Sequence, residues 1–191
     1  TTYTILIRKL QDDEEVLLIP NFKEMWSSAE VLSSSHCDFI INGGFYTKEN
    51  SPLGLFFLRG KKITDYLENS FLNGNILKYR EGAISLSSGR PSLANDLEFA
   101  LQSGPYFSLK SEAVLRFENG KARRSLIAQD SKGKIYFLAV YNSSDNFSGP
   151  DLNQLKKILL AVSNDNKLEL MSAVNLDGGS TLAFLQTDED S

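Results

Sequence analysis

The sequence predicts an α+β fold: a single domain with a mostly antiparallel or mixed β-sheet core and a few packed helices. Three observations support this. Segments rich in β-branched and aromatic residues recur along most of the 191-residue chain. Only two stretches show the apolar spacing of helices, and strands and helices do not alternate as they would in a doubly wound sheet. A chain of this length fits one domain over residues 1–191.

The strands are predicted where alternating or continuous apolar runs end at turn residues. They cover residues 2–8, 16–19, 38–41, 55–59, 76–79, 83–86, 98–102, 113–117, 125–129, 134–141, 172–176 and 181–186. The acidic turn at 12–15 predicts a hairpin between the first two. Asn119-Gly120 and the turn at 130–133 would join the strands between 113 and 141 into a meander.

Two helices are predicted. The clearer one has Ser148 as its cap, Pro150 in its first turn and Asp151 placed favourably for the helix dipole. Its apolar stripe consists of Leu152, Leu155, Ile158, Leu159 and Val162. The second spans about residues 23–32, with Met25, Ala29 and Leu32 facing inward.

Composition and charge narrow the functional classes. A net charge of −4 and a pI near 5.1 do not suit a protein that binds nucleic acid. The basic group Lys121, Arg123 and Arg124 suits one small anion instead. A single cysteine, Cys37, and a single histidine, His36, exclude an intramolecular disulfide, a Cys- or His-based zinc site and a Ser-His-Asp triad. The longest apolar run, 135–141, is too short to span a bilayer.

Two strand ends carry paired glycines. Asn42-Gly43-Gly44 follows the strand at 38–41, and Asp177-Gly178-Gly179 follows the strand at 172–176. Such glycines let the backbone adopt positive φ or approach a ligand closely, and their successive N–H groups can form an anion-binding concavity. An ordinary tight turn would also explain either sequence.

Two further segments add polar groups at strand ends. Gln102-Ser103-Gly104 closes one strand before Pro105, and Arg124 opens the strand after the turn at 119–120. An arginine presents a planar fork of donors that suits phosphate, although an arginine beside a hairpin is more often a solvated surface charge.

Taken in order, these segments resemble the motifs of the phosphodiester glycosidase family. The matches lie within residues 38–185 and are Asn42-Gly43-Gly44-Phe45, Pro52-Leu53-Gly54, Ser103-Gly104-Pro105, Arg124-Ser125 and Asn175-Leu176-Asp177-Gly178-Gly179-Ser180. Many members have Thr in place of Ser125 and a third Gly or paired Ser in place of Ser180-Thr181. Residues 63–96 match nothing in the family pattern.

The resemblance implies a hydrolase that cleaves the glycosidic bond of a sugar-1-phosphodiester, for example N-acetylglucosamine-1-phospho-R, to free sugar and a phosphate monoester. The expected catalytic residues are Asp177 and Arg124. Substrate would contact Asn42, Gly43, Gly44, Gln102, Ser103, Gly104, Gly178, Gly179 and Ser180. A phosphate monoester leaves readily as its anion, so one carboxylate suffices where ordinary glycosidases use two. Arg124 would hold the phosphate, and Asp177 would serve as nucleophile, base or electrostatic stabiliser.

Several alternatives stay open. No cofactor is required, but Asp177 and Asn42 offer oxygen ligands for a divalent cation such as Ca²⁺ or Mg²⁺. A non-catalytic module that binds carbohydrate or cell envelope is one other function. A phosphodiesterase that cuts the P–O bond is another, although such enzymes usually hold two metals with several His ligands. The expected partner is a small-molecule or glycan phosphodiester, and the expected location is periplasmic or secreted, with a signal peptide removed before Thr1.

Overall fold

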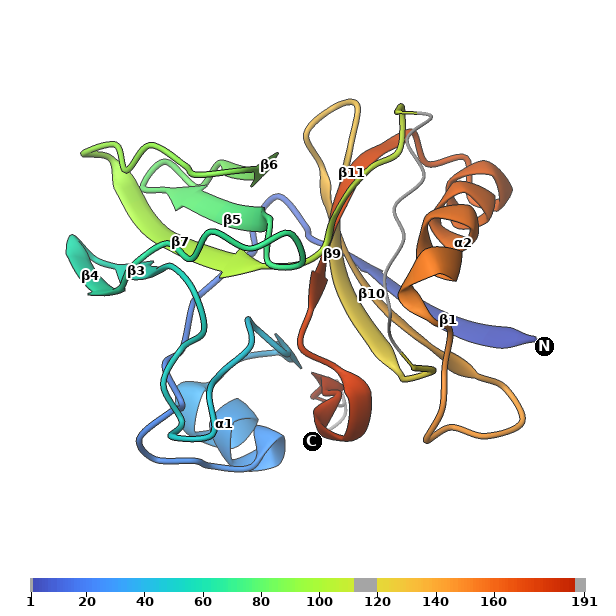
Figure 1. Cartoon of the computed structure of the whole chain (residues 1–191), viewed down its shortest axis with the longest axis horizontal. Helices are drawn as coiled ribbons and strands as arrows, with labels where there is room; N and C mark the ends of the chain where they lie inside the picture. Colours follow the sequence, from blue (N-terminus) through green and yellow to red (C-terminus); the bar gives the residue numbers. More distant parts are fainter. Residues whose placement is uncertain (1, 112–119, 188–191) are drawn as a thin grey trace.

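A computed structural model describes residues 2–111 and 120–187, and it confirms the predicted α+β class. Two five-stranded antiparallel sheets pack against each other, and helix α2 covers the outer face of the first sheet (Figure 1). The strand order is β1-β10-β9-β11-β8 in the first sheet and β4-β3-β7-β5-β6 in the second. A third, two-stranded sheet pairs β12 with β2.

The described elements have the following bounds. The first sheet consists of β1 (Tyr3–Lys9), β8 (Tyr106–Ser108), β9 (Arg124–Asp130), β10 (Ile135–Asn142) and β11 (Leu170–Leu176). The second consists of β3 (Phe56–Leu58), β4 (Lys61–Thr64), β5 (Gly74–Tyr79), β6 (Ile84–Ser88) and β7 (Leu97–Ser103). The remaining elements are β2 (Phe39–Ile41), β12 (Phe184–Gln186), α1 (Ser28–Ser35), α2 (Leu152–Asp165) and the 3₁₀ turn η1 (Gly179–Thr181). None of the described helices is long and apolar enough to cross a membrane.

The core consists of layers on both faces of the first sheet. Leu126 and Leu138 pack toward α2, where Leu155 and Leu159 meet them. Ile127, the residue after Leu126, instead packs toward the second sheet. Successive residues of a strand point to opposite faces, so a strand buried on both sides reads as the continuous apolar run seen in β9 and β10.

Helix α2 forms where the apolar stripe predicted it, but its cap is Asp151, not Ser148. The Asp151 side chain accepts a hydrogen bond from the Gln154 N–H. Ser148 lies in the preceding loop, where its carbonyl oxygen accepts the Asn142 N–H at 2.9 Å. The prediction placed the cap too early because Ser, Pro and Asp all favour a helix start and only one of them occupies the N-cap.

The prediction for the first helix was wrong in its start and its buried face. Helix α1 begins at Ser28, because Ser27 and Glu30 form a reciprocal capping box. Met25 lies before the helix at φ 53° and is exposed, and Ala29 is also exposed. Val31 is the buried residue of this helix.

The predicted hairpin between residues 2–8 and 16–19 is absent from the described structure. Strand β1 instead pairs with β10, in the register Tyr3 to Asn142. Val16 and Leu18 pack against the core between the two large sheets without joining a ladder. Alternating burial thus produced a strand-like pattern in a segment that has no partner strand.

The remaining predictions differ in detail. Strands β4 and β8 are short and were not predicted, while the last strand shortens to β12 because η1 occupies the residues just after Asp177. The antiparallel pair β9–β10, joined at residues 130–133, confirms that part of the meander. The strand predicted at 113–117 lies outside the described residues.

Candidate functional site

Three of the sequence motifs meet at the carboxyl end of β11. The Asp177 N–H donates to the carbonyl oxygen of Gly43 at 2.9 Å, which joins the two glycine pairs. The Gly179 N–H donates to the carbonyl oxygen of Arg123 at 2.9 Å. The residues after Asp177 are thereby held between the end of β2 and the start of β9.

The Ser103-Gly104-Pro105 motif contacts the same strand at Asn175, before Asp177. The Gly104 N–H and the Ser103 hydroxyl both donate to the carbonyl oxygen of Asn175, at 2.9 and 2.8 Å. The Asn175 side chain returns a bond to the Gly104 carbonyl at 2.9 Å. A Cβ on Gly104 would lie 2.0 Å from the Phe71 carbonyl oxygen, so close packing of backbone explains this glycine.

Asp177 is half-buried beside the turn that follows it. Its carboxylate accepts the Gly178 N–H at 2.8 Å. Burial raises the pKa of the Asp177 carboxyl, while the Gly178 N–H and the Thr181 hydroxyl limit the rise. Within residues 2–111 and 120–187, Asp177 forms no salt bridge. It is therefore a partly desolvated carboxylate that has no compensating cation among the described residues.

Arg124 lies at the start of β9 with its guanidinium fixed by backbone carbonyls. Its Nε donates to Pro150 at 3.0 Å and its Nη2 to Gly120 at 2.7 Å. Burial lowers the pKa of the Arg124 guanidinium, and the nearby Asp151 opposes that shift. With the described residues, these bonds use two of the five N–H donors of the guanidinium.

Arg123 reaches the turn after Asp177 more directly, and the sequence-based site omitted it. Its Nε donates to the Gly179 carbonyl and its Nη2 to the Ser180 carbonyl, both at 2.7 Å. Ser180 itself is exposed. The basic group at 121–124 was the available indication, but the family motif drew attention to Arg124 alone.

The side chain of Asn42 contacts protein backbone. Its Nδ2 donates to the Thr181 carbonyl at 2.9 Å, and its Oδ1 accepts the Ala183 N–H. Asn42 thus fixes the end of β2 against the segment that leaves the Asp177 turn. This contact positions the turn, whereas the sequence-based hypothesis gave Asn42 a direct contact with substrate.

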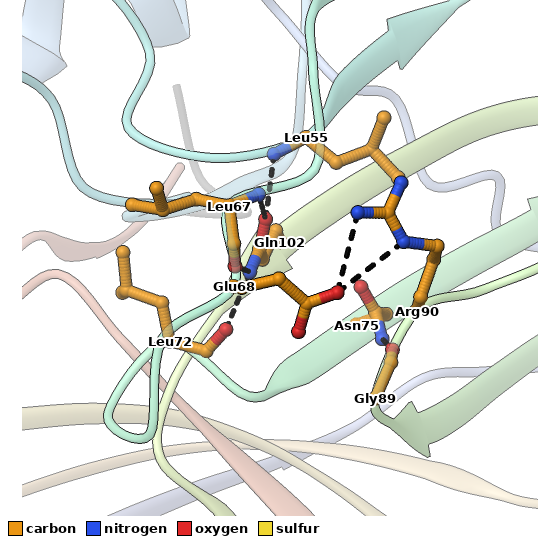
Figure 2. A network of polar contacts seen from close by, with 8 residues as sticks. All are labelled: Leu55, Leu67, Glu68, Leu72, Asn75, Gly89, Arg90 and Gln102. Carbon is orange, nitrogen blue, oxygen red and sulfur yellow. Dashed lines mark hydrogen bonds and ion pairs between the residues drawn. The ribbon is translucent and has the colours of Figure 1, made fainter.

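Gln102 is buried, and its carboxamide is hydrogen-bonded to the backbone of three other residues, as Figure 2 shows. Its Oε1 accepts the N–H groups of Leu55 and Leu67 at 2.8 and 2.9 Å. Its Nε2 donates to the carbonyls of Leu67 and Leu72. Backbone groups occupy both acceptor positions and both N–H donors of the carboxamide, so the proposed function does not include a contact between Gln102 and substrate. The same applies to Ser103, which is fully buried.

The glycines at the site serve close packing more than unusual backbone angles. Gly43, Gly44 and Gly178 do not adopt positive φ, contrary to one of the reasons given from sequence, whereas Gly179 does at 63°. A Cβ on Gly44 would lie 2.9 Å from the Gln102 carbonyl oxygen, and one on Gly178 would lie 2.7 Å from that of Arg123. Close backbone packing, and not a left-handed turn, therefore accounts for Gly44 and Gly178, whereas neither reason accounts for Gly43.

This packing predicts different outcomes for two adjacent alanine substitutions. Gly44→Ala should destabilise the protein by about 1–3 kcal/mol, because the methyl group would collide with backbone. Gly43→Ala should change stability by less than about 1 kcal/mol, because its Cβ would meet only Leu101 at 3.5 Å. Urea unfolding of both variants measures the difference. Equal stability of the two would contradict the described packing.

Some buried polar atoms lack a hydrogen-bond partner, and two of them belong to residues next to Leu176 in the first sheet. Among the described residues, the buried Ser125 Oγ, Asn175 Oδ1 and Asn75 Oδ1 have no hydrogen-bond partner. Ser125 pairs with Leu176 across the β9–β11 ladder, and Asn175 precedes Leu176 in β11, so the two side chains point to opposite faces of the first sheet. Each such group costs about 1–3 kcal/mol, and costs of this kind are characteristic of functional sites.

The structure adds no further ligand to the cation site predicted at Asp177 and Asn42 within the described residues. The described residues include no group of three or more His, Cys, Asp or Glu side chains that could hold a metal ion. One of the two suggested ligands, the Asn42 oxygen, already accepts a backbone hydrogen bond. Ca²⁺ or Mg²⁺ at Asp177 and Asn42 stays a prediction.

Comparison with known proteins agrees with the resemblance to phosphodiester glycosidases. A family model described as phosphodiester glycosidase matches residues 35–189. The catalytic domain of zebrafish N-acetylglucosamine-1-phosphodiester alpha-N-acetylglucosaminidase, auto-inhibited by its pro-peptide, has a similar fold: the TM-score is 0.64 at 17% identity, over 97% of this chain and 73% of that one. A hypothetical protein from Synechocystis gives a TM-score of 0.52 at 14% identity, over 95% of this chain and about half, 52%, of its own. No curated protein matches the sequence.

Proposed function

Because this chain belongs to the phosphodiester glycosidase family, we propose that it hydrolyses the bond between a sugar and a phosphodiester at the carboxyl end of β11. The observation that carries the proposal is the convergence of separate motifs on Asp177, with Arg123 and Arg124 on the adjoining strand start. Asp177 supplies negative charge and the arginines supply positive charge, as this reaction needs.

The proposed reaction breaks the bond between the anomeric carbon and the phosphate oxygen. The electron pair of that bond goes to the phosphate oxygen, and water adds to the anomeric carbon. The products are the free sugar and a phosphate monoester. The carboxylate of Asp177 stabilises the positive charge that develops on the sugar ring, and the fixed guanidiniums hold the departing phosphate.

The arginines are suited to this role by their rigidity. Arg123 is bonded to the turn after Asp177, and Arg124 is bonded to the segment before α2. A guanidinium held by carbonyls loses little further side-chain freedom when it binds an anion, so more of the binding energy remains for the transition state.

Hydrolysis in ¹⁸O-labelled water tests the proposal. The protein is incubated with N-acetylglucosamine-1-phospho-R esters and with esters of other sugars, and both products are analysed by mass spectrometry. We expect the label in the anomeric hydroxyl of the sugar and none in the phosphate monoester. Label in the phosphate would show P–O cleavage and refute the glycosidase proposal. Absence of turnover with every ester would favour the binding-module alternative.

We further propose that the reaction requires no cofactor, since the arginines already balance the charge of the phosphate. Turnover should persist after EDTA treatment. Loss of turnover that Ca²⁺ or Mg²⁺ restores would instead support a cation held at Asp177 and Asn42.

A further inference from the structure

Phe147 is an unusually exposed aromatic residue. It lies in the loop between β10 and α2, and 80% of its surface is accessible, the largest value for a large hydrophobic side chain in the described part of the chain. Burial of a phenylalanine ring is normally among the more stabilising contributions to a fold. A single exposed apolar residue is common, so its surroundings decide whether it matters.

The loop that carries Phe147 is held in place by several contacts. The Phe147 N–H donates to the Asp145 carboxylate at 3.0 Å, and the Ser148 N–H donates to the Asp145 carbonyl at 3.0 Å. A Cβ on Gly149 would lie 2.3 Å from the Ala122 carbonyl oxygen, so the loop is pressed against the segment before β9. The ring is therefore displayed from a backbone of defined position.

The ring adjoins the candidate site through Arg123. The Arg123 Cζ lies 5.7 Å from the centre of the Phe147 ring. The same guanidinium donates to the Gly179 and Ser180 carbonyls. One guanidinium thus separates the exposed ring from the turn that follows Asp177.

We propose that Phe147 is a stacking platform for the aglycone, the group on the far side of the phosphate from the scissile bond. This inference rests on the proposed function, in which the sugar lies at Asp177 and the phosphate at the arginines. A ring beyond Arg123 then meets the alcohol part of the ester. It selects alcohols that carry a six-membered ring with an apolar face, such as a pyranose or a cyclohexyl group, over simple alkyl alcohols.

Kinetics with matched esters test the platform. The substrates are the methyl and cyclohexylmethyl esters of N-acetylglucosamine-1-phosphate. Phe147→Ala should lower kcat/KM for the cyclohexylmethyl ester on the order of ten-fold and leave the methyl ester within about two-fold. Phe147→Trp should keep the preference for the ring ester. Leu17→Ala removes another exposed apolar side chain, from the loop after β1, and should change neither ester. Equal losses on both esters, or no loss on the ring ester, would overturn the proposal.

A binding measurement separates this proposal from the reaction on which it rests. Methyl phosphate and cyclohexylmethyl phosphate are titrated into wild type and Phe147→Ala, and binding is followed by calorimetry or NMR. In one outcome, wild type cleaves no ester yet binds cyclohexylmethyl phosphate about ten-fold more tightly than methyl phosphate, and this preference is lost in the variant. That result would support the stacking role of Phe147 and refute the proposed reaction. If wild type shows no preference for the ring phosphate, the platform is refuted whatever the turnover.

Discussion

Replacing Asp177 with asparagine should lower kcat for a sugar-1-phosphodiester by a factor on the order of 10²–10⁴ while the fold stays intact. Asparagine keeps the size of the side chain and an oxygen that can accept the Gly178 N–H, but it removes the negative charge. The charge is what the sugar ring requires as its bond to phosphate breaks. Steady-state rates on the best ester, together with thermal melting of the same preparations, measure both effects.

The stability effect has a definite sign. Burial raises the pKa of Asp177 in the folded protein above its ordinary value of 3.8, so the fold favours the neutral form. The stabilisation from this group is complete below the unfolded pKa and is lost as the pH rises through the folded pKa. At neutral pH the ionised carboxylate therefore costs stability, and Asp177→Asn should melt at the same or a slightly higher temperature. The difference should vanish near pH 3.

The wild-type rate should also fall as the pH drops through a pKa above that of an ordinary aspartate, because activity needs the ionised form of Asp177.

Asp130→Asn is the matched control for Asp177→Asn. Asp130 stands at the far end of β9, and its carboxylate accepts the N–H groups of Lys132 and Lys134. That variant should lose stability and keep its rate per folded molecule. If Asp177→Asn behaves in this way instead, Asp177 is a structural residue.

The strands could be predicted from sequence because residues buried in a strand are apolar and recur at regular positions along the chain. Leu126, Ile127 and Leu138 are buried on one face of the first sheet or the other, and continuous apolar runs follow from that arrangement. Partners could not be predicted in the same way. Val16 has the burial of a strand residue without a ladder, since the partner of β1 lies far along the chain in β10.

The place where the candidate-site motifs meet could also be predicted from sequence, because glycines and polar residues at strand ends indicate where backbones approach closely. The hydrogen bonds that each side chain makes could not be predicted. Gln102 looked like a polar group poised at a strand end, yet the segment at 67–72, which matches no family motif, surrounds its carboxamide. Arg123 was predicted only as part of a basic group with Lys121 and Arg124, yet its guanidinium donates to the turn after Asp177. Contacts between segments far apart in sequence decided both roles.

Replacing Arg124 with lysine should lower kcat/KM for the phosphodiester by a factor on the order of 10²–10³, although the positive charge is kept. The Arg124 guanidinium donates to the carbonyls of Pro150 and Gly120 with two of its five N–H groups, and in the proposed reaction the others bind phosphate. A lysine is a single flexible point charge that cannot make both sets of contacts in a fixed plane. Melting should fall as well, because two carbonyls lose a donor, so rates must be expressed per folded molecule.

The dependence on phosphate separates catalysis from structure at Arg124. Hydrolysis of an aryl glycoside without phosphate should change only a few-fold in Arg124→Lys, and competitive inhibition of wild type by inorganic phosphate should weaken in the variant. Arg59→Lys, in the exposed turn between β3 and β4, is the matched control and should leave both properties unchanged. Equal losses with and without phosphate in the substrate would assign Arg124 to the packing of β9 against the start of α2. Full activity on the phosphodiester, with unchanged inhibition by phosphate, would remove it from the site and leave Arg123 as the arginine that holds the leaving group.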